Sequence, residues 1–262
     1  MRVPVVQQHR RRRRALRRRV LWTGGEFLVT AGVVLLLLVV QQLWWTNREA
    51  RRGAEHQVQA LERQWATQTP GSGSGPGATS TPADTDAADG SSPDRSTNTA
   101  TGSGGSATTP RRSQAYAILT IPRLHLRVPI AEGVSKRNVL NKGYVGHYPG
   151  TQQPGQEGNF ALAGHRNTHG EPFRYLPRLR LKDTVQVETG TAVYTYTVDK
   201  ILPQTSAADS GVIRPIPRST VKPSYGYSTP GHYITLTTCT PEFTSRYRMA
   251  VWGTLTSTRP RT

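Results

Sequence analysis

Apolar residues gather in one long run near the start of the chain. The stretch from Phe27 to Trp45, FLVTAGVVLLLLVVQQLWW, contains 19 residues and no charged side chain. As an α-helix it would be roughly 28 Å long, which matches a hydrocarbon core of about 30 Å. Trp44 and Trp45 close the run, as aromatic residues do at a membrane interface. The pattern predicts one transmembrane signal anchor, which we assign to residues 21–45.

The charges beside this run predict its orientation. Residues 1–20 carry nine arginines and no acid, whereas only Arg48, Arg51 and Arg52 follow the run closely. The positive-inside rule therefore places the tail 1–20 in the cytoplasm and the rest of the chain outside. A cleaved signal peptide would need a small-residue cleavage site, but the chain continues as QQLWWTNREARR. We expect an uncleaved, single-pass anchor in the cell membrane.

Two polar segments separate the anchor from the rest of the chain. Residues 46–67 lack proline and place apolar residues at helical spacing, which predicts a juxtamembrane helix along the membrane or a stalk. Residues 68–112 are rich in Gly, Ser, Thr, Pro, Ala and Asp, so we expect a disordered linker. As a coil it would span roughly 35–40 Å, which would let a tethered domain range around its anchor.

Residues 113–262 are the predicted folded domain. Short runs in it alternate apolar and polar residues or are bounded by turn residues, as β-strands are. The predicted strands are 115–121, 124–130, 158–165, 184–188, 193–202, 232–239 and 247–255. Short helices are expected near 135–140, 171–176 and 206–212. Many short strands with turns between them indicate a mainly β fold that closes, or nearly closes, into a barrel.

Composition narrows the classes of function. The formal net charge is +18, and the arginine block in residues 1–20 supplies about half of it. Beside a membrane span, such a block sets topology and contacts lipid headgroups, so we expect a lipid bilayer and no nucleic acid as its partner. The chain has one cysteine, which excludes an internal disulfide. An unpaired cysteine in an exported protein is either a reactive thiol or a small buried hydrophobe.

That cysteine, Cys239, ends a predicted strand. In HYITLTTC (232–239), Ile234 and Leu236 share one face and Cys239 lies on the other, which is the period of a half-buried strand. Pro241 follows two residues later, where regular strand pairing should stop. The pattern therefore places a thiol at a strand end, where a substrate can reach it.

A catalytic thiol needs a base, and acyl transfer needs a donor for the oxyanion. Among seven histidines, His165 follows the apolar run FALAG and also ends a predicted strand, so it can converge with Cys239. Two arginines are candidates for the oxyanion donor: Arg246, just before the next predicted strand, and Arg248, at its start. Both would point to the same side of that strand, so the alternation of side chains does not show which one lies near the thiol. His165 and His169 are four residues apart, but their flanks GHRNTHGEP are typical of a loop, so we expect neither a metal nor a cofactor.

These residues carry a resemblance to a known family. TLTTC (235–239) resembles the TLXTC motif of sortases, the cysteine transpeptidases that attach proteins to Gram-positive cell walls. The likeness continues in GNFALAGHR, in LTTCTPEFTSRYRMAVWG and in KGYVGHYPGT (142–151), so it covers the whole folded domain. The sequences of these motifs are most similar to those of class E sortases of actinobacteria. The resemblance implies a closed eight-stranded sortase-type β-barrel with a few short helices.

The resemblance also implies roles for residues around the two strand ends. The implied site comprises Cys239 as nucleophile, His165 as general acid/base, Arg248 for the oxyanion and substrate positioning, and Thr237 and Thr238 for substrate binding. Arg246 competes with Arg248, but it falls in the turn TPEFTSR, and the family relation favours Arg248. The substrate pocket is expected along 203–231 and near 144–148.

The implied reaction cleaves a sorting signal in a secreted protein. The thiol attacks the Thr–Gly bond of a C-terminal LPXTG-type signal, or LAXTG in class E, and forms a thioacyl enzyme. An amine of a peptidoglycan cross-bridge or stem then resolves it. Two other classes of protein remain open. One is a cysteine-dependent cell-wall hydrolase or L,D-transpeptidase; that family carries an SHGC-type motif, with a histidine just before the nucleophile, which the sequence TTC lacks. The other is a tethered extracellular binding domain without catalytic activity.

Overall fold

The computed structural model describes residues 7–68 and 110–261, with the backbone alone for residues 7–24 and 43. Across these residues the chain forms one long helix, eight strands and four short 3₁₀ helices. The helix is α1 (Gln7–Gln68), and the strands are β1 (Ala115–Ile121), β2 (Leu126–Glu132), β3 (Val145–His147), β4 (Gly158–Ala163), β5 (Thr184–Glu188), β6 (Ala192–Ser206), β7 (His232–Thr240) and β8 (Tyr247–Pro260). The 3₁₀ helices are Pro122–Leu124, Leu140–Lys142, Leu176–Arg178 and Ser210–Ile213.

The strands close into a single barrel in the order β1-β2-β3-β4-β7-β8-β6-β5. Six of the eight neighbouring pairs are antiparallel, while β2 pairs with β3 and β4 pairs with β7 in parallel. The prediction of a mainly β, closed eight-stranded barrel is confirmed. The β4–β7 pair matters most for the candidate site, because His165 lies two residues after the end of β4 and Cys239 is the next-to-last residue of β7.

The barrel interior holds the main apolar core, as the alternation along the strands predicts. Ile130, Phe160, Leu162, Ile234 and Leu236 all have at most 1% of their surface exposed and belong to one cluster. A closed barrel of this size is filled by such inward side chains. The core therefore gives the strand ends a rigid support.

The outer face of β7 is buried as well, which corrects the expectation of a half-buried strand. Thr235 is fully buried, and its hydroxyl donates to Asn159 Oδ1 at 2.7 Å. Trp252 of β8 is also fully buried, and its indole donates to the carbonyl of Val212 in the 3₁₀ helix Ser210–Ile213. The segment between β6 and β7 therefore covers this face, a long-range contact that alternation along one strand does not reveal.

Most predicted strands agree with the observed ones, and the differences have local causes. β1 and β5 coincide with their predicted ranges, and β6 and β8 extend further than predicted. β3 was missed because three residues, VGH, are too few to show a period. Helices expected at 135–140, 171–176 and 206–212 occur instead as single 3₁₀ turns at or just beyond those ranges.

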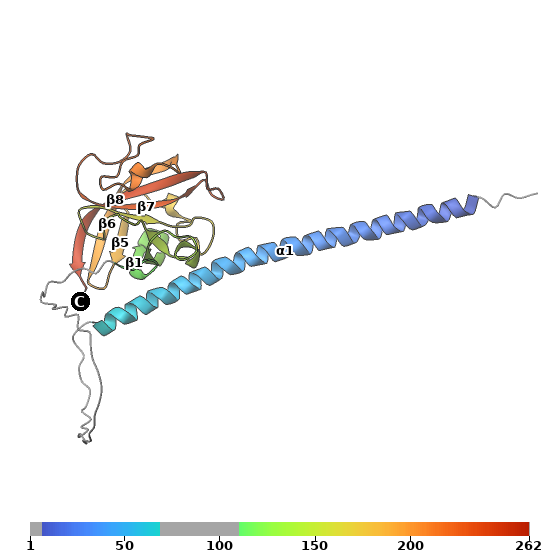
Figure 1. Cartoon of the computed structure of the whole chain (residues 1–262), viewed down its shortest axis with the longest axis horizontal. Coiled ribbons are helices and arrows are strands. Elements are labelled where there is room, and N and C mark those ends of the chain that lie inside the picture. Colours follow the sequence, from blue (N-terminus) through green and yellow to red (C-terminus); the bar gives the residue numbers. More distant parts are fainter. Residues whose placement is uncertain (1–6, 69–109, 262) are drawn as a thin grey trace, which may run out of the picture.

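α1 is one continuous helix across the predicted tail, anchor and juxtamembrane segments. Figure 1 shows its blue N-terminal part projecting away and its cyan end beside the barrel. It is the one described helix long and apolar enough to cross a membrane, and its described large apolar side chains between Phe27 and Trp45 are 50–78% exposed. The predicted linker lies largely at 69–109, outside the described residues. The domain boundaries therefore stay predictions.

The juxtamembrane part of α1 packs on the barrel. The apolar stripe that the helical spacing predicts is at most 6% exposed and consists of Ala54, Val58, Leu61 and Trp65. Val58, Leu61 and Trp65 form a cluster with Ile118 on the outer face of β1. The barrel is thus docked on this helix.

Candidate active site

The register between β4 and β7 brings His165 level with Cys239. Each paired position differs by 74 residues, as in Ala163 with Thr237, and His165 and Cys239 also differ by 74 (239 − 165). The pairing continues past the end of β4, because Gly164 N–H donates to Thr237 C=O at 3.1 Å. Residues at one level of neighbouring strands point to the same face. His165 and Cys239 therefore share the outer face of the barrel.

Arg248 faces Cys239 from the other side. β7 and β8 are antiparallel, and Cys239 pairs directly with Arg248. Side chains of directly opposed residues lie on one face about 4.5–5.5 Å apart at Cβ. The registers thus place the three residues that the sequence singled out on neighbouring strands at one level of the barrel. Arg246 lies outside β8, exposed, with its guanidinium over the ring of Tyr247 at 5.1 Å.

The Arg248 guanidinium is held by the turn that precedes it. Its Nη1 donates to the carbonyls of Ser245 at 2.9 Å and Tyr247 at 3.0 Å. Those two bonds use both hydrogens of Nη1, and its Nε and Nη2 hydrogens have no partner among the described residues. A guanidinium fixed in this way, on the residue opposite Cys239, keeps N–H groups that can bind an oxyanion or a substrate carbonyl.

A hydrogen bond to Asn141 selects the tautomer of His165. His165 Nε2 lies 2.9 Å from Asn141 Oδ1. A carbonyl oxygen only accepts, so Nε2 carries the proton in the neutral ring and Nδ1 is the basic nitrogen. The ring also stacks on His169, with centroids 5.4 Å apart. Asn141 is thus a positioning residue that sequence reasoning missed, since no strand or motif marked it.

Burial lowers the pKa of His165 to about 4, and the positive charges of His169 and Lys136 add to the effect. A group with this pKa is neutral at pH 7, whereas an ordinary histidine is partly protonated near neutrality. The imidazole is therefore neutral at pH 7, with Nδ1 unprotonated.

Arg166, the next residue, ties the two strand ends together. Its Nη1 donates to the backbone carbonyl of Cys239 at 3.2 Å and to Thr240 Oγ1 at 3.0 Å. These bonds hold the backbone of Cys239 against the residues that follow β4. Sequence reasoning quoted Arg166 in GNFALAGHR but assigned it no role.

Thr237 and Thr238, the predicted substrate-binding residues, are both buried at 3% exposure. Thr237 Oγ1 donates to the carbonyl of Leu162 at 3.0 Å and lies 3.1 Å from the Tyr148 hydroxyl. Thr238 Oγ1 donates to the carbonyl of Gly164 at 2.8 Å. Both hydroxyls therefore fasten β7 to β4, and contact of these residues with a substrate stays a prediction.

Unpaired polar atoms gather directly after His165. In the described part of the chain, four buried side-chain N or O atoms lack a hydrogen-bond partner. Three of them follow His165 closely: Arg166 Nε, Asn167 Oδ1 and His169 Nδ1. Unsatisfied buried groups are rare in folded proteins and often mark a site for a ligand or water. Among the side chains that the structure describes, no group of three or more His, Cys, Asp or Glu residues is suited to a metal.

Comparison with known proteins identifies the family. The family model described as "Sortase domain" matches residues 119–256, which are 138 of the 262 residues. Sortase SrtE1 of Streptomyces coelicolor is 51% identical over 153 residues, covering 56% of this chain and 42% of that protein. Sortase SrtE2 of the same organism is 36% identical over 145 residues, covering 53% and 55%. This chain thus spans about half the length of these two relatives.

Solved structures agree with the sequence comparison. The crystal structure of sortase E1 from S. coelicolor, with a tripeptide in its active site, has a TM-score of 0.54 and 49% identity, covering 58% of this chain and 94% of that one. Sortase E from Streptomyces avermitilis has a TM-score of 0.51 and 42% identity, covering 57% and 93%. The chain belongs to the sortase family, and its similarity to sortase E1 supports class E within it.

Proposed function

We propose that this protein is a membrane-anchored cysteine transpeptidase that cleaves a sorting signal and joins the released protein to a cell-wall amine. One observation carries the proposal: the strand registers around β7 bring His165 and Arg248 to the same face as Cys239. Membership of the sortase family, whose members are cysteine transpeptidases, supports the same chemistry. The tripeptide in the active site of sortase E1 supports a peptide substrate.

In the first half-reaction Cys239 Sγ attacks the carbonyl carbon of the signal's threonine. The thiol proton passes to His165 Nδ1, because Asn141 occupies Nε2. Arg248 binds the developing oxyanion through its free N–H groups. When the Thr–Gly bond breaks, His165 gives the proton to the leaving glycine amine, and a thioester remains on Cys239.

In the second half-reaction an amine of a peptidoglycan cross-bridge or stem attacks the thioester carbonyl. His165 takes a proton from this amine, and the thiolate leaves with that proton as the thiol. The new amide bond joins the secreted protein to the wall. Sorting signals of the LPXTG or LAXTG type are the substrates we propose, and we propose that the segment 203–231 and the stretch near 144–148 line their binding groove.

The test is turnover of a quenched LAETG peptide by the full chain in detergent, with and without an amine nucleophile. We expect amine-dependent transfer and a thioacyl adduct on Cys239 visible by mass spectrometry. Cys239→Ala should abolish both. Arg248→Ala should lower kcat by about 10²–10³-fold, the cost of losing one oxyanion donor. Arg246→Ala is the matched control and should remain within a few-fold of the wild type.

Several results would contradict the proposal. Unchanged turnover in Cys239→Ala would refute the cysteine mechanism. Turnover of neither LAETG nor LPETG by the wild type would refute the substrate assignment. Peptide hydrolysis that an amine neither diverts nor accelerates would favour a hydrolase. A larger loss in Arg246→Ala than in Arg248→Ala would exchange the roles of the two arginines.

A further inference from the structure

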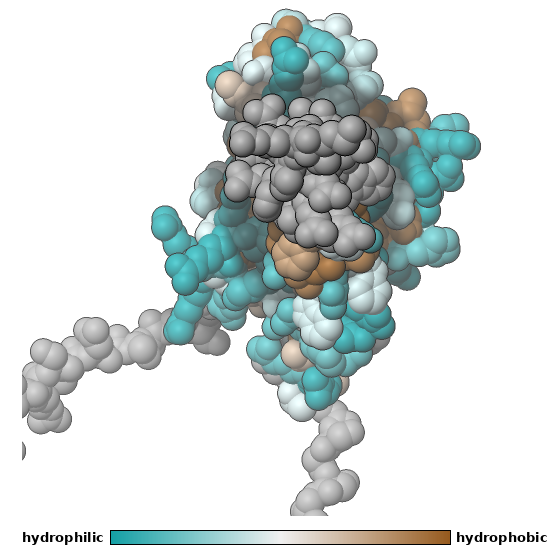
Figure 2. All heavy atoms as spheres, turned by 90° about the vertical axis from the view of Figure 1, so that its right-hand side faces the viewer, coloured by the Kyte–Doolittle hydropathy of each residue, from teal (hydrophilic) through white to brown (hydrophobic). Residues whose placement is uncertain are grey.

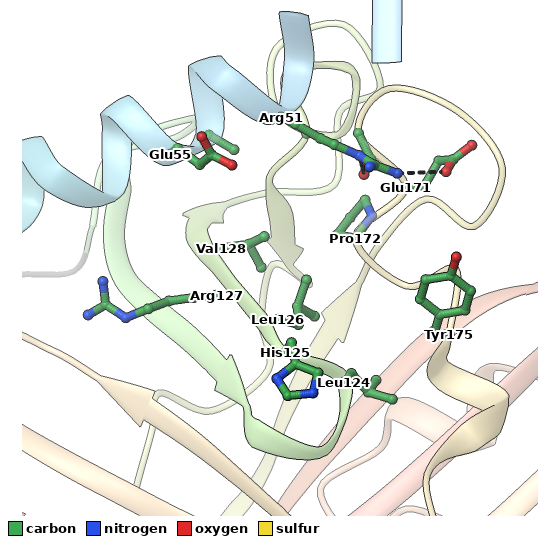
Figure 3. A pocket seen from close by; sticks show the side chains of 13 residues that line it. Arg51, Glu55, Leu124, His125, Leu126, Arg127, Val128, Glu171, Pro172 and Tyr175 are labelled. Carbon is green, nitrogen blue, oxygen red and sulfur yellow. Dashed lines mark hydrogen bonds and ion pairs between the residues drawn. The ribbon is translucent and has the colours of Figure 1, made fainter. Parts of the chain in front are cut away.

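The start of the docked part of α1 contacts the loop that carries His165. Arg51 Nη2 forms an ion pair with Glu171 Oε2 at 3.0 Å, and its Nε donates to the carbonyl of Gly170 at 3.1 Å. Asn47 Nδ2 donates to Glu171 Oε1 at 2.9 Å. Glu171 has a side chain only 4% exposed, so these are buried contacts of a charged group. Figure 3 shows Arg51 reaching from α1 to Glu171 across the edge of a cleft of about 220 Å³.

The same carboxylate continues the contact toward the nucleophile. Arg174 Nη1 bonds Glu171 Oε2 at 2.8 Å, and Arg174 Nη2 pairs with Glu242 Oε1 at 3.2 Å. Glu242 lies three residues after Cys239 in the turn between β7 and β8. A chain of ion pairs therefore links Arg51 on α1 to both loops that flank the site.

A second segment beside His165 also lies against the start of the docked helix. A Cβ at Gly143 would lie 2.8 Å from the backbone carbonyl oxygen of Ala50, so α1 and this turn are in close backbone contact. Gly143 is two residues from Asn141, which holds His165 Nε2. Thus α1 meets the active-site end of the barrel on two loops near Ala50.

The other end of α1 lies at the opposite end of the barrel. Trp65 packs on Gly190 in the β5–β6 turn, and the guanidinium of Arg261 lies 4.6 Å from its ring centre. Between the two ends of the docked helix, Glu62 forms an ion pair with Arg127 at 2.8 Å. Because β5 and β6 join at this turn and Arg248 pairs with the far end of β6, Gly190 and Arg248 mark opposite barrel ends.

From these contacts we infer that the active-site end of the barrel faces the lipid headgroup layer. The inference rests on the proposed membrane span ending at Trp45. Asn47 is only two residues beyond it, roughly 3 Å along the helix, whereas Trp65 is 20 residues beyond, roughly 30 Å. The helix therefore brings the loops around His165 and Cys239 to the membrane first and carries the β5–β6 turn away from it.

The surface at this end suits an anionic lipid layer. Lys136, Arg137, Lys142 and Arg246 are exposed on its loops, whereas the acids Glu171 and Glu242 are already paired with arginines. Phe243, at the turn after Cys239, is 75% exposed. Figure 2 looks along α1 at this side of the molecule and shows a mainly hydrophilic surface with separate hydrophobic patches. Basic side chains with exposed aromatics are typical of membrane interfaces.

The single cysteine allows a direct test in the full chain. The protein is reconstituted in vesicles of phosphatidylglycerol and phosphatidylcholine that carry a headgroup-linked acceptor dye, and Cys239 is labelled with a small donor. The matched position is Thr191→Cys in a Cys239→Ala background, an exposed site next to Gly190. We expect higher energy transfer from position 239, because the two labels should differ in height by up to roughly 30 Å.

The outcomes separate this inference from the catalytic proposal, because energy transfer does not depend on turnover. If the protein floats with the vesicles but energy transfer from position 191 equals or exceeds that from position 239, the inferred orientation is wrong and the membrane span stands. Failure to float with the vesicles overturns the span and the orientation together. Arg51→Glu should shrink the difference between the two positions, whereas Arg52→Glu, an exposed neighbour with the same charge change, should leave it intact. No change in Arg51→Glu would refute the role of the Glu171 contact.

Discussion

The strand registers place His165, Cys239 and Arg248 at one level on the outer face of the barrel, and local hydrogen bonds hold each of the three residues. Asn141 sets the tautomer of His165, the turn carbonyls of Ser245 and Tyr247 hold Arg248, and Arg166 grips the backbone of Cys239. In the proposed mechanism such support matters, because small displacements of reacting groups cost large factors in rate. The lowered pKa of His165 is likewise a local effect, because it follows from burial of the ring and from the positive charges of His169 and Lys136.

The imidazole of His165 should titrate near pH 4, and His169→Gln should raise its pKa toward 6.5 by removing one opposing charge. NMR of histidine-labelled full chain in micelles measures both values. The unfolded chain binds this proton near pH 6.5. It therefore holds more protons than the folded chain between pH 6.5 and 4, so this group lowers stability as the pH falls through that window. His232→Gln, an exposed control, should change nothing, and a wild-type value near 6.5 would contradict the assignment.

At the scale of elements, buried polar pairs join strands whose backbone pairing is short. β3 has only three residues, and its parallel pairing with β2 ends at Glu132 and His147. His147 Nδ1 lies 2.6 Å from Glu132 Oε2, and His147 is 1% exposed. Thr151 Oγ1 lies 2.9 Å from His147 Nε2. Both ring nitrogens are thus satisfied, which supports a structural role for this histidine, the default that sequence reasoning gave it.

Removing the carboxylate should leave His147 Nδ1 buried without a partner. We therefore expect Glu132→Ala to lower the free energy of unfolding by about 1–3 kcal/mol, the usual cost of an unsatisfied buried group. Urea denaturation in micelles, followed by tryptophan fluorescence, measures the change. Glu157→Ala, at an exposed position in the turn before β4, is the control and should stay within about 0.5 kcal/mol of the wild type. Equal stability of both variants would show that the pair contributes nothing.

At the scale of the whole molecule, one helix combines two tasks that the sequence separated. Its exposed apolar part, Phe27–Trp45, is long enough to span a bilayer, and the part that follows is built into the surface of the barrel. The helix is continuous between the two parts, so the barrel's position relative to the membrane follows from the docking contacts.

The predicted membrane topology can be tested by chemical labelling of the single cysteine. In intact cells a membrane-impermeant maleimide should label Cys239, because the arginine-rich tail is expected in the cytoplasm and the barrel outside. Ala15→Cys in a Cys239→Ala background places the only thiol in the tail and should react only after the membrane is permeabilised. Labelling of position 15 but not 239 in intact cells would show the opposite orientation.

The sequence alone determined the features that depend on neighbouring residues. The charge-free run Phe27–Trp45, the alternation in β1 and β5, and the motifs around Cys239 and His165 are all local, and each was found. The elements it missed or shortened are those without a period of their own, such as the three residues of β3. The alternation of β7 was found as well, but its second buried face depends on Val212 and Trp252, which lie far away in the chain.

Only the tertiary structure decided how these elements meet. The 74-residue offset between β4 and β7 places His165 level with Cys239, and the β7–β8 register selects Arg248 rather than Arg246 as the residue opposite the thiol. The docking of α1 on the barrel likewise joins residues more than a hundred positions apart, such as Arg51 and Glu171. Strand registers and docking depend on contacts between distant segments, and one segment's pattern cannot specify which partner it meets or at what height.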